Sequence, residues 1–153
     1  MNTLGLRASP TEVTFCIYDT DSNEIINVEA IKIPNALEMP EKLKYIRATI
    51  LDVLREYNVR TAGIRLTEDI ARKPSVERIQ IEGVLQEAFA SSTLINYFQG
   101  ALGTLASKLG ENKTLLSTLI KTKTAVYDRV DGWEQYDDKE REAIIAAIGA
   151  KNV

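Results

Sequence analysis

Three segments near the start of the chain carry the hydrophobic and polar pattern expected of β-strands. Residues 3–9 form a short, largely apolar run, and residues 13–18 are dense in β-branched and aromatic side chains. Residues 25–33 alternate apolar and polar positions until Pro34, which ends the pattern. Asp, Ser and Asn gather at 19–23, where a turn is favoured. We therefore expect an antiparallel meander of three strands.

The pattern then changes to a helical period. Residues 40–58 place apolar side chains three and four positions apart, and Pro40 suits the first turn of a helix. The short apolar run 61–66 is typical of a strand inside a sheet that helices flank. A strand, a crossover helix and a parallel strand are predicted.

The second half of the chain predicts one more strand among several helices. A helix begins near Ser75 and continues to about residue 90, and residues 94–98 read as a fifth strand. Helical periodicity returns in three further segments: 102–109, 113–121 and 139–150. We find no internal repeat. The fold class is therefore α/β, with a mixed five-stranded sheet of three antiparallel and two parallel strands flanked by helices.

Length and composition narrow the chemistry. A chain of 153 residues fits one domain spanning 1–153. It has no histidine and a single cysteine, Cys16, which excludes an internal disulfide, a Cys/His zinc site and a histidine-based nucleophile system. No stretch approaches the roughly 18 apolar residues of a membrane span, so we expect a cytoplasmic protein without a membrane partner. The net charge of −3 argues against a surface that attracts nucleic acid everywhere.

The order of elements resembles the RuvC-type resolvase branch of the RNase H-like superfamily. Residues 4–9 (Leu-Gly-Leu-Arg-Ala-Ser) are similar to that family's apolar-Gly-apolar-Asp-Pro-Gly strand. Residues 63–65 align with its apolar-apolar-Glu, and residues 81–85 with a helix that makes a small-residue contact. Residues 141–147 are similar to the helix that supplies the last acid. The resemblance implies an RNase H-like fold over nearly the whole chain.

The same resemblance locates the site. Active members hold two Mg²⁺ ions with clustered carboxylates. By position, the family's first acid falls on Arg7, the second on Arg65 and the last on Glu142. Two fixed positive charges would repel a divalent cation, so the resemblance implies a degenerate nuclease that needs no metal or other cofactor. A displaced acidic site that uses Mg²⁺ is the alternative, and its further carboxylates would be Glu68, Asp69 and Asp138.

Three interpretations of Arg7 and Arg65 stay open at this point. They are surface residues of their strands, or they pair with Glu142 as a structural ion cluster, or they grip phosphate. A path of phosphate contacts would require other basic residues to converge with them. The candidates for nucleic-acid contact are Arg7, Arg65, Arg72, Lys73, Lys108 and Lys113.

Trp133 and Tyr136 lie in an acidic segment before the last helix. They are either packing residues or anchors for a partner protein. Taken together, the sequence predicts a catalytically inactive RuvC-like protein that acts as an interaction module, self-associates as a homodimer or binds another protein, and has nucleic acid as an open second partner. The alternatives are a metal-dependent endonuclease with a displaced carboxylate site and a regulatory subunit of a larger complex.

Overall fold

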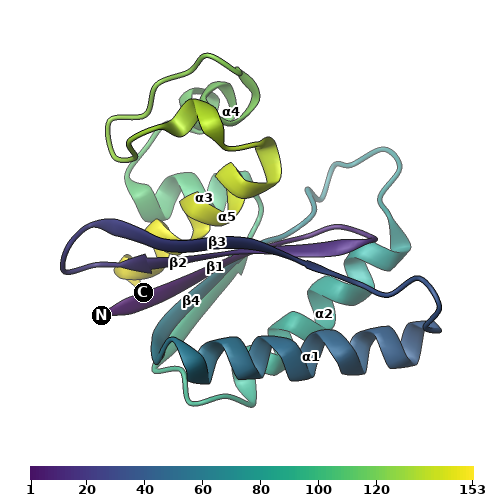
Figure 1. Ribbon diagram of the computed structural model, residues 1–153. Helices are drawn as coiled ribbons and strands as arrows, with labels where there is room; N and C mark the ends of the chain where they lie inside the picture. Colours follow the sequence, from purple (N-terminus) through teal and green to yellow (C-terminus); the bar gives the residue numbers. More distant parts are fainter.

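The sheet has five strands in the order β3-β2-β1-β4-β5, and it separates two groups of helices (Figure 1). The computed structural model describes residues 1–153. β1 pairs antiparallel with β2 and parallel with β4, so the mixed sheet predicted from the sequence is confirmed. The strands are β1 Asn2–Ala8, β2 Glu12–Asp19, β3 Glu24–Lys32, β4 Val59–Arg65 and β5 Asn96–Gly100.

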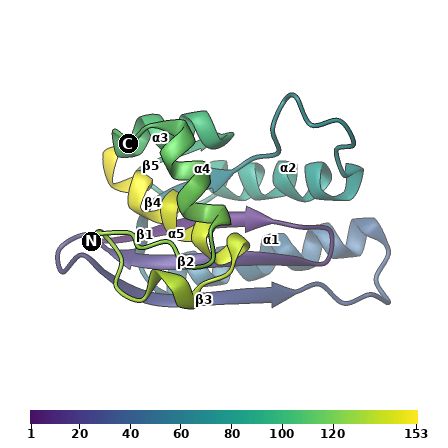
Figure 2. The same ribbon diagram turned by 90° about the horizontal axis from the view of Figure 1, so that it is seen from above.

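The helices divide between the two faces of the sheet. α1 and α2 cover one face, whereas α3, α4 and α5 lie over the other (Figure 1). Seen from above, α5 crosses the central strands diagonally (Figure 2). No helix is both long enough and apolar enough to span a membrane. The helices are α1 Met39–Glu56, α2 Val76–Ala90, α3 Leu102–Leu109, α4 Lys113–Lys121 and α5 Asp138–Gly149, with 3-10 turns at Trp133–Gln135 and Ala150–Asn152.

One strand begins later than the sequence pattern indicates. The pattern placed the fifth strand at 94–98, but β5 runs from Asn96 to Gly100. Leu94 packs against the core and Ile95 is exposed, and both precede the first residue of β5 that pairs with β4. The pairing of Gly100 with Arg65 extends the strand past the last apolar residue. Backbone pairing with β4, rather than side-chain character, sets these boundaries.

β1 and β4 carry the same five-residue pattern, Thr-x-Gly-x-Arg. In the parallel register Thr3 pairs with Thr61, Gly5 with Gly63 and Arg7 with Arg65. Because alternate residues of a strand share a face, all six side-chain positions lie on the face that α5 covers. We call this pair of motifs the Thr-Gly-Arg ladder. The sequence inspection missed it because it becomes a repeat only when the two strands are paired.

The ladder fixes the position of α5. A Cβ atom added to Gly5 would lie 1.9 Å from the carbonyl oxygen of Ala143, so only glycine allows the helix to approach this closely. The hydroxyls of Thr3 and Thr61 donate to the carbonyl oxygens of Ala147 and Ala150, at 2.6 and 2.8 Å. These carbonyls lie at the end of the helix, where intrahelical donors are lacking. The helix is thereby held against both central strands.

The other end of α5 begins at a well-formed cap. The Asp137 side chain accepts from the backbone N–H of Glu140, and the Glu140 side chain accepts from the backbone N–H of Asp137. Glu142 follows in the first turns of the helix, directly above the ends of β1 and β4. The expected small-residue contact in α2 is not found, because nothing lies within 4 Å of a Cβ added to Gly83. The close small-residue contact is made by Gly5 instead.

Candidate functional site

The arginines of the ladder meet Glu142 at the carboxyl ends of β1 and β4. Arg7 Nε donates to Glu142 Oε2 at 2.7 Å. Arg65 Nε lies 3.5 Å from Glu142 Oε1, a charge contact that is too poorly aligned to be a hydrogen bond. Arg65 is buried and Glu142 is only 12% exposed. One carboxylate thus lies between two guanidinium groups that water reaches only in part.

Arg65 also pairs with two groups in the loop that follows β4. Its Nη2 lies 3.1 Å from Glu68 Oε1, and its Nη1 donates to the backbone carbonyl of Leu66. Glu68 also accepts from the backbone N–H of Leu102, at the start of α3. Arg65 therefore ties the end of β4 to the loop that follows it and to the opposite layer of helices.

A third arginine, Arg78 of α2, joins the cluster. Its Nε lies 2.9 Å from Glu82 Oε2, and Glu82 accepts from the backbone N–H and the hydroxyl of Thr67. Nε and Nη2 of Arg78 are buried and make no hydrogen bond. Burial first, and then the nearby charge of Arg7, lowers the pKa of Arg78. The Arg78 guanidinium therefore lies near the positive charge of Arg7 and has N–H groups that make no hydrogen bond within the chain.

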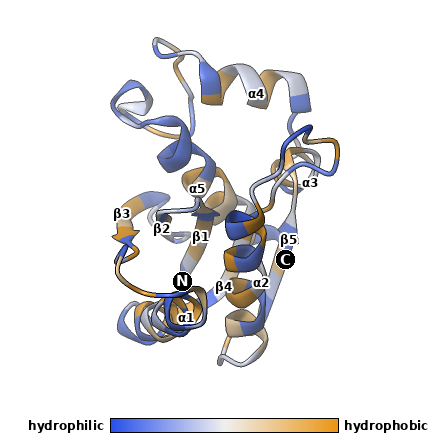
Figure 3. Ribbon diagram, turned by 90° about the vertical axis from the view of Figure 1, so that its right-hand side faces the viewer, coloured by the Kyte–Doolittle hydropathy of each residue, from blue (hydrophilic) through white to orange (hydrophobic).

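A pocket of about 410 Å³ opens at this cluster, and we call it the basic pocket. Its charged lining residues are Arg7, Lys73, Arg78 and Lys139, and no acidic residue lines it. The carboxylates that balance these charges lie behind their partners: Glu142 behind Arg7, and Glu82 behind Arg78. The pocket therefore presents positive charge to solvent. Figure 3 views the protein from this end of the sheet.

Lys139 comes from the first turn of α5 and lies 3.1 Å from Glu12 Oε1. Lys32 pairs with the other oxygen of the same carboxylate. These two contacts, Lys32 first and then Lys139, lower the pKa of Glu12. Glu12 therefore stays ionised at a lower pH than an ordinary glutamate, and its ion pair holds Lys139 at the rim of the basic pocket.

The residues present do not fit the metal pair that the resemblance implies. Magnesium requires several oxygen ligands, but the positions of the first two acids carry Arg7 and Arg65, and Glu142 is already shared between them. No three acidic or thiol side chains lie close enough together to hold a metal ion. The cluster places positive charge where the resemblance implies carboxylates.

The carboxylates considered for a displaced site do not form one. Glu68 pairs with Arg65, Asp69 lies in the exposed loop after it, and Asp138 opens α5 without making an ion pair. Glu68 and Glu142 contact the same guanidinium from two sides. The structure uses them to neutralise arginine.

The other basic candidates separate into two groups. Lys73 lines the basic pocket, and Arg72 is exposed beside it in the loop before α2. Lys108 lies over the Phe98 ring, 5.7 Å from its centre, and its Cβ is near Gly149 at the far end of α5. Lys113 begins α4, close to Gly103. Lys108 and Lys113 therefore do not join Arg7 and Arg65.

Trp133 lies in the core, which removes it from the candidate partner anchors. It is 1% exposed, its indole N–H donates to the Leu119 carbonyl at 2.8 Å, and Tyr127 packs edge-on against it. Tyr136 is partly buried against the same cluster. The acidic segment around them folds over the sheet instead of presenting its aromatic residues.

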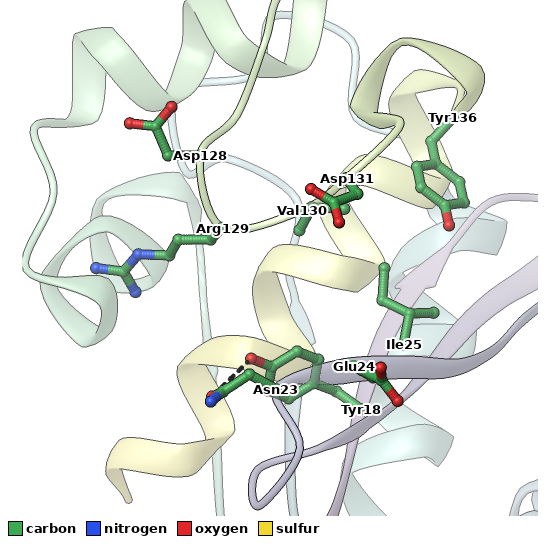
Figure 4. A pocket seen from close by; sticks show the side chains of 9 residues that line it. All are labelled: Tyr18, Asn23, Glu24, Ile25, Asp128, Arg129, Val130, Asp131 and Tyr136. Carbon is green, nitrogen blue, oxygen red and sulfur yellow. Dashed lines mark hydrogen bonds between the residues drawn. The ribbon is translucent and has the colours of Figure 1, made fainter.

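A second pocket, of about 440 Å³, lies between the β2–β3 turn and the segment before α5 (Figure 4). Its lining carries the acids Glu24, Asp128 and Asp131 with Arg129 among them. Their carboxylates point in different directions and do not converge on one point (Figure 4). Its one hydrogen bond between lining side chains joins Tyr18 to Asn23, at 3.2 Å. This pocket offers no arrangement for catalysis.

Comparison with solved structures identifies the fold as that of the RuvC-type resolvases. The chain is similar to Thermus thermophilus RuvC in complex with a Holliday junction substrate, with 13% identity, a TM-score of 0.71, and coverage of 97% of this chain and 91% of that one. A second Thermus thermophilus RuvC structure has 12% identity, a TM-score of 0.69, and coverage of 97% and 92%. The yeast mitochondrial Holliday junction resolvase has 14% identity, a TM-score of 0.50, and coverage of 96% and 76%.

The chain therefore has a RuvC-like fold. No protein-family model and no curated protein sequence matches it. At this level of identity the likeness establishes the architecture, and function has to be argued from the site.

Sequence reasoning missed part of the site. Arg78, Lys139 and Ser75 come from two different helix starts and were not among the candidates. One signal was present: Arg78 follows the N-cap Ser75 by three residues, which places it in the first turn of α2. That this turn lies beside Arg7 depends on how α2 packs across β1, which no local pattern specifies.

Proposed function

We propose that this protein is a RuvC-fold interaction module that does not hydrolyse nucleic acid, binds the phosphate backbone of nucleic acid at the arginine cluster, and self-associates. The observation that carries the proposal is the pairing of Arg7 and Arg65 around the single carboxylate of Glu142. Two-metal hydrolysis needs a concentration of negative charge at this position. The cluster supplies the opposite sign.

Electrostatics argues against a bound divalent cation. At an effective dielectric of about 20, two unit charges 4 Å apart interact by about 4 kcal/mol, and a divalent ion doubles this repulsion from each guanidinium. Arginine stays protonated throughout the working pH range, so the site cannot relieve the repulsion by losing a proton. The two carboxylates at the cluster, Glu142 and Glu68, are already paired with these arginines.

Anion binding is favoured by the same charges. Arg7 Nη2 makes no hydrogen bond within the chain, and Lys73 makes no ion pair. Guanidinium groups recognise phosphate through paired donors. A similar fold was solved with a Holliday junction substrate, which supports nucleic acid as the class of ligand. The proposal for this chain rests on its own cluster.

Self-association is proposed through the open face of α2. Val76 and Ile79 are exposed, at 65% and 46%. Gly83 lies one turn of the helix after Ile79, and a Cβ added to it would meet no atom within 4 Å. Figure 3 shows hydrophobic positions among the hydrophilic ones along this helix. A glycine on an exposed helix face costs about 1 kcal/mol relative to alanine, a cost that close approach of a second helix would offset.

The absence of hydrolysis is tested by adding Mg²⁺ and Mn²⁺ in separate titrations of thermal stability. We expect no saturable rise in the melting temperature, because no site binds either ion tightly. Incubation with branched, single-stranded and RNA–DNA hybrid substrates should leave them intact. Metal-dependent cleavage that is lost in a Glu68→Gln or Asp138→Asn variant would establish the displaced-site nuclease instead.

Backbone binding is tested by gel shifts at about 50 and 200 mM salt. Binding through phosphates should weaken steeply with salt, since displaced counterions accompany each contact. An Arg7→Gln, Lys73→Ala variant should bind several-fold more weakly. Lys108→Ala removes a charge at the far end of α5 and is the matched control. Absence of binding at the lower salt would contradict the nucleic-acid part of the proposal.

Self-association is tested by light scattering coupled to size-exclusion chromatography. Val76→Lys should shift the protein toward monomer, because it places a charge at the start of the apolar stripe. Ile95→Lys, at a position that is also exposed but on another surface, should leave the mass unchanged. A monomeric wild-type protein at high micromolar concentration would rule out this part.

A further inference from the structure

The basic pocket has more donors than a nucleic-acid backbone phosphate can use. A phosphodiester offers two non-bridging oxygens and one negative charge. A terminal phosphate offers three strong acceptor oxygens and a charge of about −1.5 to −2 at neutral pH. Arg7, Lys73, Arg78 and Lys139 all line the same pocket. Four positively charged side chains suit the larger charge and the additional acceptor oxygen of a terminal phosphate.

Arg78 shows that the cluster is incomplete without an anion. Its Nε is engaged in the ion pair with Glu82, but its Nη2 is buried and has no hydrogen-bond partner. A buried donor left unpaired destabilises the folded state unless another molecule accepts from it. Glu82 contacts Nε of Arg78 and accepts from the backbone N–H and hydroxyl of Thr67, and none of these contacts involves Nη2. Arg78 also lines the basic pocket.

Hydroxyl groups and a helix start complete the lining. Ser75, the N-cap of α2, and Ser9, at the end of β1, both border the pocket. The positive end of the α2 dipole adds to the charge of the four side chains. The one carboxylate on this helix start is exposed Glu77, which contacts the Ser75 hydroxyl at 3.2 Å and lies outside the lining.

From these observations we infer that the basic pocket binds the terminal phosphate monoester of a nucleic-acid strand in preference to an internal phosphodiester. The inference rests on the proposed nucleic-acid binding, which it makes specific. Arg7 and Arg78 supply guanidinium donors to two of the phosphate oxygens, and Lys73 and Lys139 supply charge at the rim. The strand end is thus held beside the position where a nuclease of this fold would cleave.

The test compares short fluorescent single strands that carry a 5′-phosphate, a 3′-phosphate or only hydroxyl ends, measured by anisotropy at one salt concentration. At least one phosphorylated strand should bind about tenfold more tightly than the hydroxyl strand, as expected for added charge-assisted hydrogen bonds. The two phosphorylated strands identify which end is preferred. Equal affinity for all three strands would overturn the inference while leaving backbone binding intact.

Variants locate the effect. Lys73→Ala removes an exposed side chain that makes no ion pair, so it should fold normally, and it should lower the preference for the phosphorylated strand several-fold. Arg78→Gln should abolish the preference, whereas Lys108→Ala should preserve it. Glu77→Gln removes the charge of the exposed carboxylate that accepts from the Ser75 hydroxyl and should increase the preference. An unchanged ratio in both Lys73→Ala and Arg78→Gln would place the phosphate elsewhere and reject the pocket.

Inorganic phosphate separates the two proposals. If no strand binds but phosphate raises the melting temperature in the wild type and not in Lys73→Ala, the phosphate pocket stands and nucleic-acid binding fails. If neither strands nor phosphate bind, both fail. Chloride at equal ionic strength is the control for non-specific screening.

Discussion

Two neighbouring residues of α5, Arg141 and Glu142, belong to regions that treat arginine in opposite ways. Arg141 is 2% exposed, with no carboxylate partner, and donates to backbone carbonyls between Leu119 and Lys123 and to that of Trp133. Its guanidinium also lies 5.2 Å from the centre of the Trp133 ring. On the other side of the helix, Glu142 faces arginines whose donors are only partly used.

Arg141 and Arg78 differ in how many of their nitrogens donate hydrogen bonds within the chain. Every nitrogen of Arg141 has a partner, so it fastens the segment between α4 and α5 onto the sheet and has nothing left to offer a ligand. Arg78 has buried nitrogens without partners and lines an open pocket. The two arginines therefore differ in how many of their donors are used within the chain, and the proposed anion binding applies to the one with donors that are not used.

The largest expected effect comes from Arg141→Met. This change keeps an apolar stem of similar length but removes all the hydrogen bonds from the buried guanidinium to five backbone carbonyls. The carbonyls of Leu119, Thr122 and Trp133 keep another donor, whereas those of Ile120 and Lys123 do not, so we expect a loss of about 3–5 kcal/mol in the free energy of unfolding. Urea denaturation followed by tryptophan fluorescence measures it, since Trp133 reports on the same segment. A loss below about 1 kcal/mol would contradict the structural role assigned to Arg141.

Gly5→Ala tests whether the ladder must admit α5 so closely. The added methyl group would meet the Ala143 carbonyl, and overpacking of this kind costs about 1–3 kcal/mol or more. Gly83→Ala is the matched control, because its Cβ meets nothing and should stabilise the exposed helix by about 1 kcal/mol in the absence of a partner. Thermal unfolding of both variants distinguishes them by sign.

Arg78→Met applies the first substitution to the other region. We expect a smaller loss, of about 2 kcal/mol, because the change removes one ion pair, with Glu82, and Glu82 keeps its contacts with Thr67. The same denaturation assay compares it with Arg141→Met. If both variants lose equal stability, partner satisfaction does not distinguish the two kinds of arginine.

The smallest effect is expected at Tyr127, whose hydroxyl is buried without a partner. Burial raises the pKa of Tyr127 to about 12, above its ordinary value of 10.0. The unfolded chain therefore ionises first, and stability should fall as pH rises from about 10 to 12. Tyr127→Phe should keep the packing against Trp133, gain up to about 1 kcal/mol at neutral pH and lose less at pH 11. Urea denaturation of the wild type and the variant at pH 7 and 11 tests both expectations. A larger loss of stability at pH 11 in the variant than in the wild type would contradict the role assigned to Tyr127.

The sequence predicted the elements well because each depends on local pattern. Alternation in β3 and the helical period of α1 arise within single segments, and both were placed within a few residues. β5 was displaced because its limits depend on pairing with β4. Arg7, Arg65 and Glu142 were brought together by the family resemblance, whereas composition and spacing contain no such information.

What the sequence could not provide is proximity between elements. The relation between Thr3-x-Gly5-x-Arg7 and Thr61-x-Gly63-x-Arg65 is visible only in the paired register. Arg141 was read only as part of the last helix, because its partners are backbone carbonyls that any sequence supplies. Trp133 in an acidic segment was compatible with surface and core alike, and the folding of that segment onto α5 decided for the core.

The shared carboxylate of Glu142 makes the arrangement resistant to change by single steps. Replacing Arg7 alone with aspartate would bring a second carboxylate beside Glu142 while leaving Arg65 as their only counter-charge. Replacing Arg65 alone would additionally strand Glu68. A magnesium centre at this position would therefore require both replacements together.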